Sequence, residues 1–161
     1  MDQLTGSILI STPFAPKTDQ ESVMLICDAN KFGVLAFQIN QTEYSLEAEL
    51  TEEENIWFAI HTLDKNVANE HLLIDNKWFG VTQFTQETQE SIALYKKSLI
   101  VSSHIFWTVP QFKNALKQMH WILGKCNSKL IFQTSIASKW LDSLIFNNIE
   151  LSFLVSQSYN I

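Results

Sequence analysis

The sequence predicts an α+β fold, because strand patterns fill its first half and helix patterns gather in its second half. Two pairs of apolar, β-branched segments flank short polar turns, which is typical of antiparallel hairpins. Glycine and proline are scarce, with four and three residues among 161, so the elements should follow one another closely. We therefore expect one domain over residues 1–161, and an α+β rather than a doubly wound α/β architecture.

Apolar runs bounded by turn residues define the expected strands. A first strand over residues 8–12 ends at the turn between Pro13 and Pro16. Segment 44–50 fits either a short strand or irregular structure. The other expected strands are 22–28 and 32–39 in a first hairpin, 71–74 and 78–84 in a second hairpin, 98–102, 130–132 and 149–155.

Caps and apolar stripes define four expected helices. The first covers residues 52–64, where Thr51 and Glu54 form a capping box ahead of an apolar stripe. The other three are a short helix over 88–97, one that begins at Pro110 and ends at Gly124, and a last one capped by Thr134 or Ser135. The stripe after Pro110 consists of Phe112, Ala115, Leu116, Met119 and Leu123.

The charge balance disfavours direct nucleic-acid binding. The formal net charge is −6, and all eleven basic residues are lysines, so the chain has no arginine. Nucleic-acid binding normally needs a basic face, and arginine is the usual reader of phosphates and guanine edges. A local patch of Lys113, Lys117, Lys125 and Lys129 remains an alternative, but a solvated surface explains these lysines more simply.

The apolar runs and the cysteines point to a reducing compartment without membrane contact. The longest apolar runs have about five residues, whereas a membrane-spanning helix needs about twenty. Met1, Asp2 and Gln3 form no basic region of a signal peptide, so we expect a cytoplasmic protein. Cys27 and Cys126 are too few for a disulfide framework and should be free thiols.

Searches for catalytic patterns find none that is complete. The four glycines form neither a phosphate-binding loop nor a dinucleotide fingerprint, and no nucleophile elbow is present. The four histidines lack metal-ligand spacing, and helix capping explains the acidic residues 52–54. Cys27 should be inert, because the neighbouring Asp28 disfavours its thiolate. We therefore expect no catalytic residue, no cofactor and no metal.

A small-molecule or enzymatic site assembled from scattered residues is the alternative. Its candidates are polar or aromatic side chains at strand ends or in loops, where binding residues are common. They are Asp28, Asn40, His104 and Trp107. Burial of these side chains as packing or turn residues would argue against such a site.

Both ends of the chain resemble one family. Residues 4–13 resemble "L-T-G-x-F-L-I-A-x-P", residues 23–28 resemble "V-I-Y-L-C-E", and residues 32–40 resemble "G-A-L-G-L-V-I-N". Residues 111–116 with Trp121 match "Q-L-E-x-E-L…W", and residues 130–134 with Trp140 match "L-L-F-x-T…R-W". In this order and spacing, the chain resembles a divergent member of the bacterial AlgH/YqgE family.

The chain departs from this pattern in its middle. The histidine of the family's "H-N" is Ala29 here, followed by Asn30. The central "G-G-P-V…D-R-G-F" is not recognisable in residues 71–84, and of "G-Y-x-G-W-G-x-G-Q-L" only Trp107 and Gln111 remain. The role of those glycine-rich loops in the family is therefore in doubt for this chain.

The resemblance implies bifurcated, partly barrel-like antiparallel or mixed β-sheets flanked by helices. It implies no established activity or cofactor, although some members carry the label of transcriptional regulator. We expect a non-enzymatic cytoplasmic protein that acts through contacts with a protein partner, with regulation only indirect. The scattered-residue site is the alternative, and direct DNA binding is a third hypothesis that the composition does not support.

Overall fold

The computed structural model describes residues 2–41, 56–63, 72–74, 77–95 and 97–150, together with Ser152 and Leu154. It contains a five-stranded sheet with strand order β8-β3-β2-β1-β9 and a four-stranded sheet with order β5-β6-β4-β7. Every strand pairing among the described residues is antiparallel, and the sheets do not close into a barrel. The α+β class with antiparallel sheets is confirmed, but the partly barrel-like arrangement that the resemblance implied is not present in the described residues.

The five-stranded sheet contains the first expected hairpin. Its strands are β1 (Ile8–Ser11), β2 (Val23–Asn30), β3 (Gly33–Gln38), β8 (His104–Trp107) and β9 (Trp121–Gly124). The β2–β3 register shifts between Ile26 and Asp28, so Cys27 forms a β-bulge. Gly33 has φ of 157°, and a Cβ built there would lie 2.2 Å from the Trp107 carbonyl oxygen on β8. Glycine is therefore required at this close approach of β3 to β8.

The four-stranded sheet contains the second expected hairpin and one corrected element. Its strands are β4 (Trp57–Thr62), β5 (Leu72–Ile74), β6 (Lys77–Phe84) and β7 (Ser98–Val101). The helix expected over 52–64 is wrong where the structure describes it, because β4 occupies 57–62; the capping box and segment 44–50 lie outside the described residues. Aromatic and β-branched residues favour strands, and β4 pairs with both β6 and β7.

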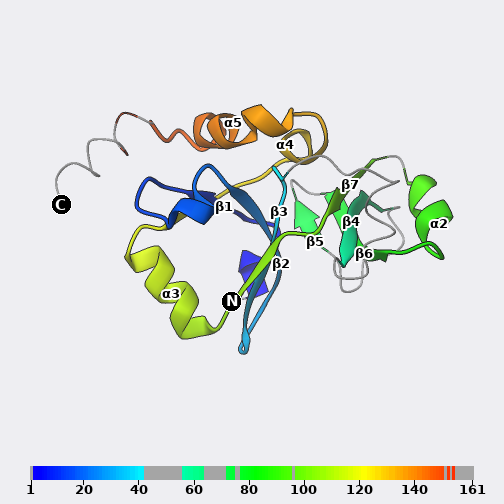
Figure 1. Cartoon of the computed structure of the whole chain (residues 1–161), viewed down its shortest axis with the longest axis horizontal. Helices are drawn as coiled ribbons and strands as arrows, with labels where there is room; N and C mark the ends of the chain where they lie inside the picture. Colours follow the sequence, from blue (N-terminus) through cyan, green and yellow to red (C-terminus); the bar gives the residue numbers. More distant parts are fainter. Residues whose placement is uncertain are drawn as a thin grey trace.

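Helices cover these sheets on several sides. They are α2 (Gln89–Ala93), α3 (Val109–Lys117), α4 (Ser128–Phe132) and α5 (Lys139–Phe146), with 3-10 turns η1 (Asp2–Leu4), η2 (Lys17–Asp19) and η3 (Ile136–Ser138). Figure 1 shows α3 on one side of the five-stranded sheet, and α4 and α5 on the other. The short helix expected over 88–97 is confirmed as α2, and the last expected helix as α5.

Three expected element types in the C-terminal half are wrong. The helix that begins beside Pro110 ends at Lys117, because Met119 adopts φ of 59° and the next residues form β9 against β1. The strand expected over 130–132 is the end of α4, which the Asn127 side chain caps by accepting a 2.9 Å hydrogen bond from the Leu130 N–H. The strand expected over 149–155 is not formed at Ser152 and Leu154, which are helical.

The hydrophobic core forms on both faces of the five-stranded sheet. On one face, Leu9, Met24 and Ile26 pack with Phe112 of α3 and with Trp121. The opposite face contributes to a larger cluster that also contains side chains of the second sheet and of α4 and α5. These shared members include Ile8, Leu25, Phe37, Ile60, Phe79, Val101, Ile131 and Leu144. The two sheets and the C-terminal helices therefore pack around a common apolar cluster, and the cavity described next lies at its edge.

Candidate functional site

A cavity of about 430 Å³ lies where β7, the end of β3 and the α4–η3–α5 segment meet. Its apolar wall consists of Ile39, Leu99, Ile100, Val101, Ile131, Phe132 and Ile136. Its polar lining consists of Gln41, Ser98, Gln133, Thr134, Ser135 and Lys139. Ser98, Gln133 and Ser135 are solvent-exposed, so the cavity opens to water on their side. We call this space the Lys139 cavity.

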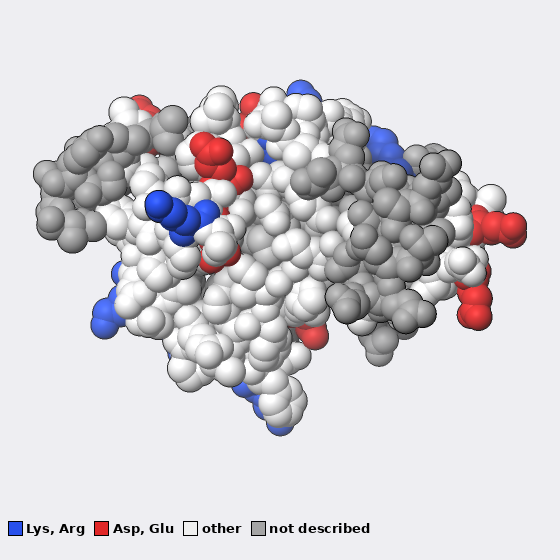
Figure 2. All heavy atoms as spheres, in the orientation of Figure 1, with Lys and Arg blue, Asp and Glu red and all other residues white. Residues whose placement is uncertain are grey.

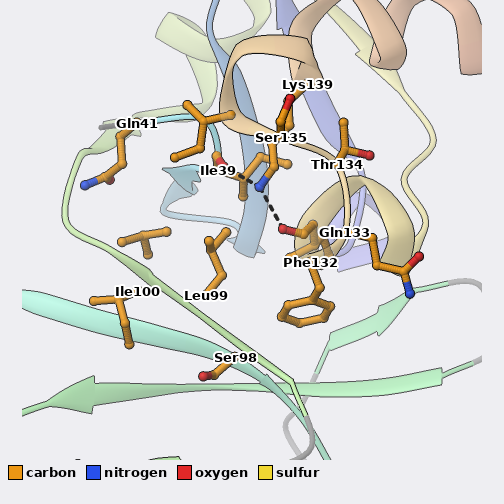
Figure 3. A pocket seen from close by; sticks show the side chains of 13 residues that line it. Ile39, Gln41, Ser98, Leu99, Ile100, Phe132, Gln133, Thr134, Ser135 and Lys139 are labelled. Carbon is orange, nitrogen blue, oxygen red and sulfur yellow. Dashed lines mark hydrogen bonds between the residues drawn. The ribbon is translucent and has the colours of Figure 1, made fainter. Parts of the chain in front are cut away.

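Lys139 is the one buried cation among the described residues. It is the first residue of α5, and its side chain is only 2% exposed. Its Nζ donates a 2.8 Å hydrogen bond to the Ile39 carbonyl and a 2.7 Å hydrogen bond to the Ile131 carbonyl. Figure 3 shows this side chain reaching the space between Ile39 and Phe132, with both hydrogen bonds dashed. Lys139 therefore ties the chain after β3 to the C-terminal turn of α4.

The electrostatic surroundings of Lys139 are unusual for a lysine. Within the described part of the chain, no carboxylate forms an ion pair with it, and its two partners are neutral carbonyls. Burial lowers the pKa of the Lys139 ammonium from 10.5 to about 8, and the nearby Cys126 thiol acts weakly in the opposite direction. A lysine whose pKa is shifted by burial and which lines a cavity is a candidate functional group, because functional sites are where such shifts gather.

The walls beside Lys139 are held by their own hydrogen bonds. Gln41 Oε1 accepts 2.9 Å hydrogen bonds from the N–H groups of Ser102 and Ser103, which fixes the segment after β7. Thr134 Oγ1 donates a 3.1 Å hydrogen bond to the Lys129 carbonyl at the end of α4. Ser98 and Gln133 make no side-chain hydrogen bond with another described residue, so both are available to a ligand. The cavity thus combines an apolar wall, two available polar groups at its rim and one buried amine.

The four residues singled out from the sequence do not gather at one place. Asp28 lies opposite Leu35 and Trp107 opposite Val34, toward the hairpin end of the ladder, whereas His104 lies opposite Phe37. Asn40 follows β3 beyond the His104 end of that ladder. None of the four lines the Lys139 cavity.

The individual contacts of these residues are structural in character. Trp107 is 9% exposed and packs against Phe112 and Trp121, which corrects the expectation that it forms a surface site. Asn40 accepts a 2.9 Å hydrogen bond from the Val23 N–H and donates a 2.7 Å hydrogen bond to the Glu21 carbonyl. His104 is exposed, with its Nδ1 3.1 Å from the Ser102 carbonyl oxygen.

The last of these four residues is Asp28, which directly follows Cys27, one of the two thiols that the sequence predicts to be free. Asp28 is exposed, and its nearest side-chain partner is the Asn30 amide at 3.5 Å. Both cysteines are free. Burial raises the pKa of the Cys27 thiol to about 12, and the neighbouring Asp28 adds to this direction, as the sequence predicts. Burial also raises the pKa of Cys126 to about 12.

No cluster of three or more histidine, cysteine, aspartate or glutamate side chains suited to a metal ion occurs within the described residues. Among the helices that the structure describes, none has the length and apolar character needed to cross a membrane. The groups available for chemistry at the cavity are therefore the Lys139 amine, hydroxyls, amides and main-chain atoms.

Sequence reasoning missed Lys139. A single lysine inside an apolar helix pattern is indistinguishable from a solvated one when its neighbours in space are not known. One signal was present, since Lys139 directly precedes Trp140 and so takes the position of the arginine in the pattern "L-L-F-x-T…R-W". A basic residue at that position, on the buried face of the last helix, is the sequence feature that indicates this site.

The structural comparisons agree with this architecture. No protein-family model matches the chain. The solution structure of the AlgH protein from Pseudomonas aeruginosa, a UPF0301 protein, superposes with a TM-score of 0.65 at 17% identity, covering 94% of this chain and 93% of that chain. A UPF0301 protein of Cytophaga hutchinsonii is 25% identical over 158 residues, covering 86% of this chain and 87% of the relative. In sequence and fold, the chain resembles proteins of the AlgH/YqgE (UPF0301) family.

A second solved structure shows the same fold. The crystal structure of a protein from Corynebacterium diphtheriae superposes with a TM-score of 0.67 at 11% identity, covering 92% of this chain and 90% of that chain. The names of these three similar proteins state no activity, substrate or partner. These similarities therefore show the fold of this chain, and its function has to be argued from its own residues.

Proposed function

We propose that this chain is a cytoplasmic binding protein that holds a small organic acid in the Lys139 cavity. The observation that carries the proposal is a buried amine with two main-chain acceptors, no described carboxylate partner and an open cavity beside it. A buried ammonium is costly unless it is paired, and a ligand carboxylate would supply the missing charge. The two free thiols fit the reducing compartment that this proposal assumes.

The cavity suits a short acid better than a large or highly charged ligand. Its volume of about 430 Å³ lies toward the lower end of ligand pockets, which span roughly 300–1,000 Å³. The apolar side chains of Ile39, Leu99 and Phe132 provide contacts for an aliphatic chain. Lys139 is the one cation in the lining, whereas recognition of a phosphate usually involves several donors or an arginine fork.

Butanoate is a suitable probe, and binding is measured by NMR titration and calorimetry at pH 7. We expect weak binding in wild type, with shifts centred on residues 131–136 and 98–101. Lys139→Met should weaken it at least about tenfold, since a lost charge-assisted hydrogen bond is worth about 1.5–3 kcal/mol. Lys129→Met, which removes an exposed lysine of α4 outside the cavity, is the matched control and should bind as wild type. Equal butanoate binding by wild type and Lys139→Met would contradict the proposal.

The second candidate is the accessory role through protein contacts that the sequence predicts. The observation that favours it is a group of exposed apolar side chains on α5 and β9, namely Leu141, Ile145, Phe146 and Leu123. Leu123 and Phe146 line the same surface hollow. Its occupant would be the apolar face of a protein partner, because exposed apolar groups of this kind mark contact sites.

An indirect regulatory role would belong to this second candidate. Figure 2 shows the lysines of one face as isolated patches among neutral and acidic atoms, which fits the expectation against direct DNA contact. Ile145→Lys should abolish capture of a defined partner, whereas Leu94→Lys, at a still more exposed residue after α2, should leave it intact. Capture that survives Ile145→Lys, or that Leu94→Lys also abolishes, would count against this surface.

A further inference from the structure

The hydrogen bonds of Lys139 match those of a neutral amine. An ammonium has three N–H donors, whereas a neutral amine has two N–H donors and one lone pair. The main chain presents two acceptors to Nζ, at Ile39 and Ile131, and no described residue provides a third. Two acceptors satisfy the neutral amine fully, and its lone pair then occupies the remaining tetrahedral direction. Lys139 lines the cavity, so a ligand held there lies beside this amine.

We infer that Lys139 is a nucleophilic lysine that forms an imine with the carbonyl carbon of a short-chain 2-oxo acid held in the cavity. The inference rests on the proposed binding of small organic acids and names a reactive class among them. The ammonium form of Lys139 pairs with the ligand carboxylate, as in the proposed binding, and the adjacent 2-oxo carbon then lies one bond farther along the ligand, beside Nζ, when the amine loses its proton. The amine and the electrophilic carbon are therefore held within reach of each other, which is the main requirement for rapid addition.

Burial supplies the reactive form of the amine. The pKa of about 8 leaves roughly a tenth of Lys139 neutral at pH 7, about 300-fold more than for a lysine with the ordinary value of 10.5. The titratable group that acts on Lys139 among the described residues is Cys126, whose own pKa near 12 keeps it an uncharged thiol over this range. Desolvation of a lysine amine is an established way to create a nucleophile that reacts with carbonyl groups.

The condensation balances without any further reactant. The Nζ lone pair attacks the 2-oxo carbon, a C–N bond forms, and one of the two Nζ protons passes to the carbonyl oxygen, which becomes the hydroxyl group of a carbinolamine with one N–H. This hydroxyl then takes a proton from solvent and leaves as water, and the nitrogen lone pair forms the C=N bond while the nitrogen keeps its remaining N–H. A protonated imine keeps one N–H, which can still donate to one of the two carbonyls at Ile39 and Ile131. No oxidant or reductant is needed.

The test uses the full-length protein with 2-oxobutanoate as the probe and cyanoborohydride to trap the imine. Intact mass followed by peptide mapping identifies the modified lysine. We expect one reduced adduct at Lys139, forming on the order of 10²-fold faster than at an average exposed lysine, in a yield that rises with pH around 8. Adducts spread over exposed lysines such as Lys113 and Lys129, with Lys139 unmodified in wild type, would overturn the inference.

Two comparisons separate this inference from the proposed function. The matched acid 2-hydroxybutanoate has no carbonyl group at that carbon, so it should bind without giving an adduct. Binding of 2-hydroxybutanoate with no trapped 2-oxobutanoate overturns the imine and leaves the binding function standing. A trapped Lys139 adduct without measurable 2-hydroxybutanoate binding supports the imine and contradicts the general binding function. Lys129→Arg, which keeps Lys139, should give the wild-type adduct.

Discussion

Replacing Lys139 by methionine should change how the stability of the protein depends on pH. The folded-state pKa near 8 lies below the value of 10.5 for an ordinary lysine, so burial makes the charged form costly in the folded protein. Between these two values the unfolded chain holds a proton that the folded chain has lost. Raising the pH through this range therefore favours the folded state of wild type. Methionine does not titrate, so Lys139→Met lacks this contribution.

The size of the effect follows from the pKa difference. One pKa unit corresponds to about 1.4 kcal/mol, and most of the Lys139 titration falls between pH 7 and pH 10. The free energy of unfolding of wild type, relative to that of Lys139→Met, should therefore rise by about 2–3 kcal/mol over this range. At pH 7 the difference in free energy of unfolding between wild type and Lys139→Met has a second contribution. The variant leaves the carbonyls of Ile39 and Ile131 without their hydrogen-bond donor.

Urea unfolding followed by tryptophan fluorescence, at pH 7, 8, 9 and 10, measures the difference between the two proteins. The raised pKa values of Cys27 and Cys126 lower stability above about pH 9, but they do so in both proteins and largely cancel in the difference. Lys129→Met, at an exposed lysine of the same region, should track wild type. A wild-type minus Lys139→Met difference that stays flat, or falls, as the pH rises would refute the view of Lys139 as a desolvated amine.

Three further predictions concern other parts of the fold. Gly33→Ala should destabilise the protein by about 3 kcal/mol in urea unfolding, because its Cβ would meet the Trp107 carbonyl oxygen at 2.2 Å in a strained backbone conformation. Thr108→Ala removes the capping box of α3 and should cost about 1 kcal/mol, measured in the same way. Cys27 and Cys126, with pKa values near 12, should react with a thiol reagent at pH 8 on the order of 10³-fold more slowly in the folded than in the unfolded protein. Rapid reaction of either folded thiol would contradict the stated burial.

The hairpins were predictable from sequence because their information is local. The apolar segments 23–30 and 33–38 flank a short polar turn, and so do segments 72–74 and 77–84. The wrong predictions of secondary structure occur where pairing with strands that are distant in the sequence decides whether a segment is a helix or a strand. The run at 57–62 has both of its faces covered and fits a buried helix as well as a strand, and only its pairing with β6 and β7 selects the strand.

A similar limit explains the C-terminal errors. Residues 121–124 continue the apolar stripe of α3, but the edge of β1 offers them hydrogen bonds that end the helix at Lys117. By contrast, the cap of α4 was available in the sequence, since Asn127 is a favoured N-cap residue placed directly before the segment. Its short length hid the helix, because 130–132 alone reads as three strand-forming residues.

The candidate site was less predictable than the fold, because its defining property is the burial of one lysine. Composition showed that all basic residues are lysines, and only the position of Lys139 directly before Trp140 distinguishes it from the others in the sequence. The hydrogen bonds that hold the buried Lys139 amine go to the carbonyls of Ile39 and Ile131, which lie 100 and 8 residues away along the chain. The site residues expected from the sequence do not lie together, because the strand register separates His104 from Trp107 along one edge of the sheet.

The lysine at residue 139 makes both parts of the proposed chemistry, acid binding and imine formation, open to this chain. The family pattern has arginine before the tryptophan, and an arginine could also bind a carboxylate, but its guanidinium remains charged at every accessible pH. Lysine can lose its proton near pH 8 in this cavity and become a nucleophile. Lys139→Arg should therefore retain butanoate binding within a few fold and lose the trapped 2-oxobutanoate adduct entirely. If the arginine variant lost both properties while remaining folded by circular dichroism, the amine would be needed for shape rather than for reactivity. Retention of the adduct in that variant would place the reaction at another lysine.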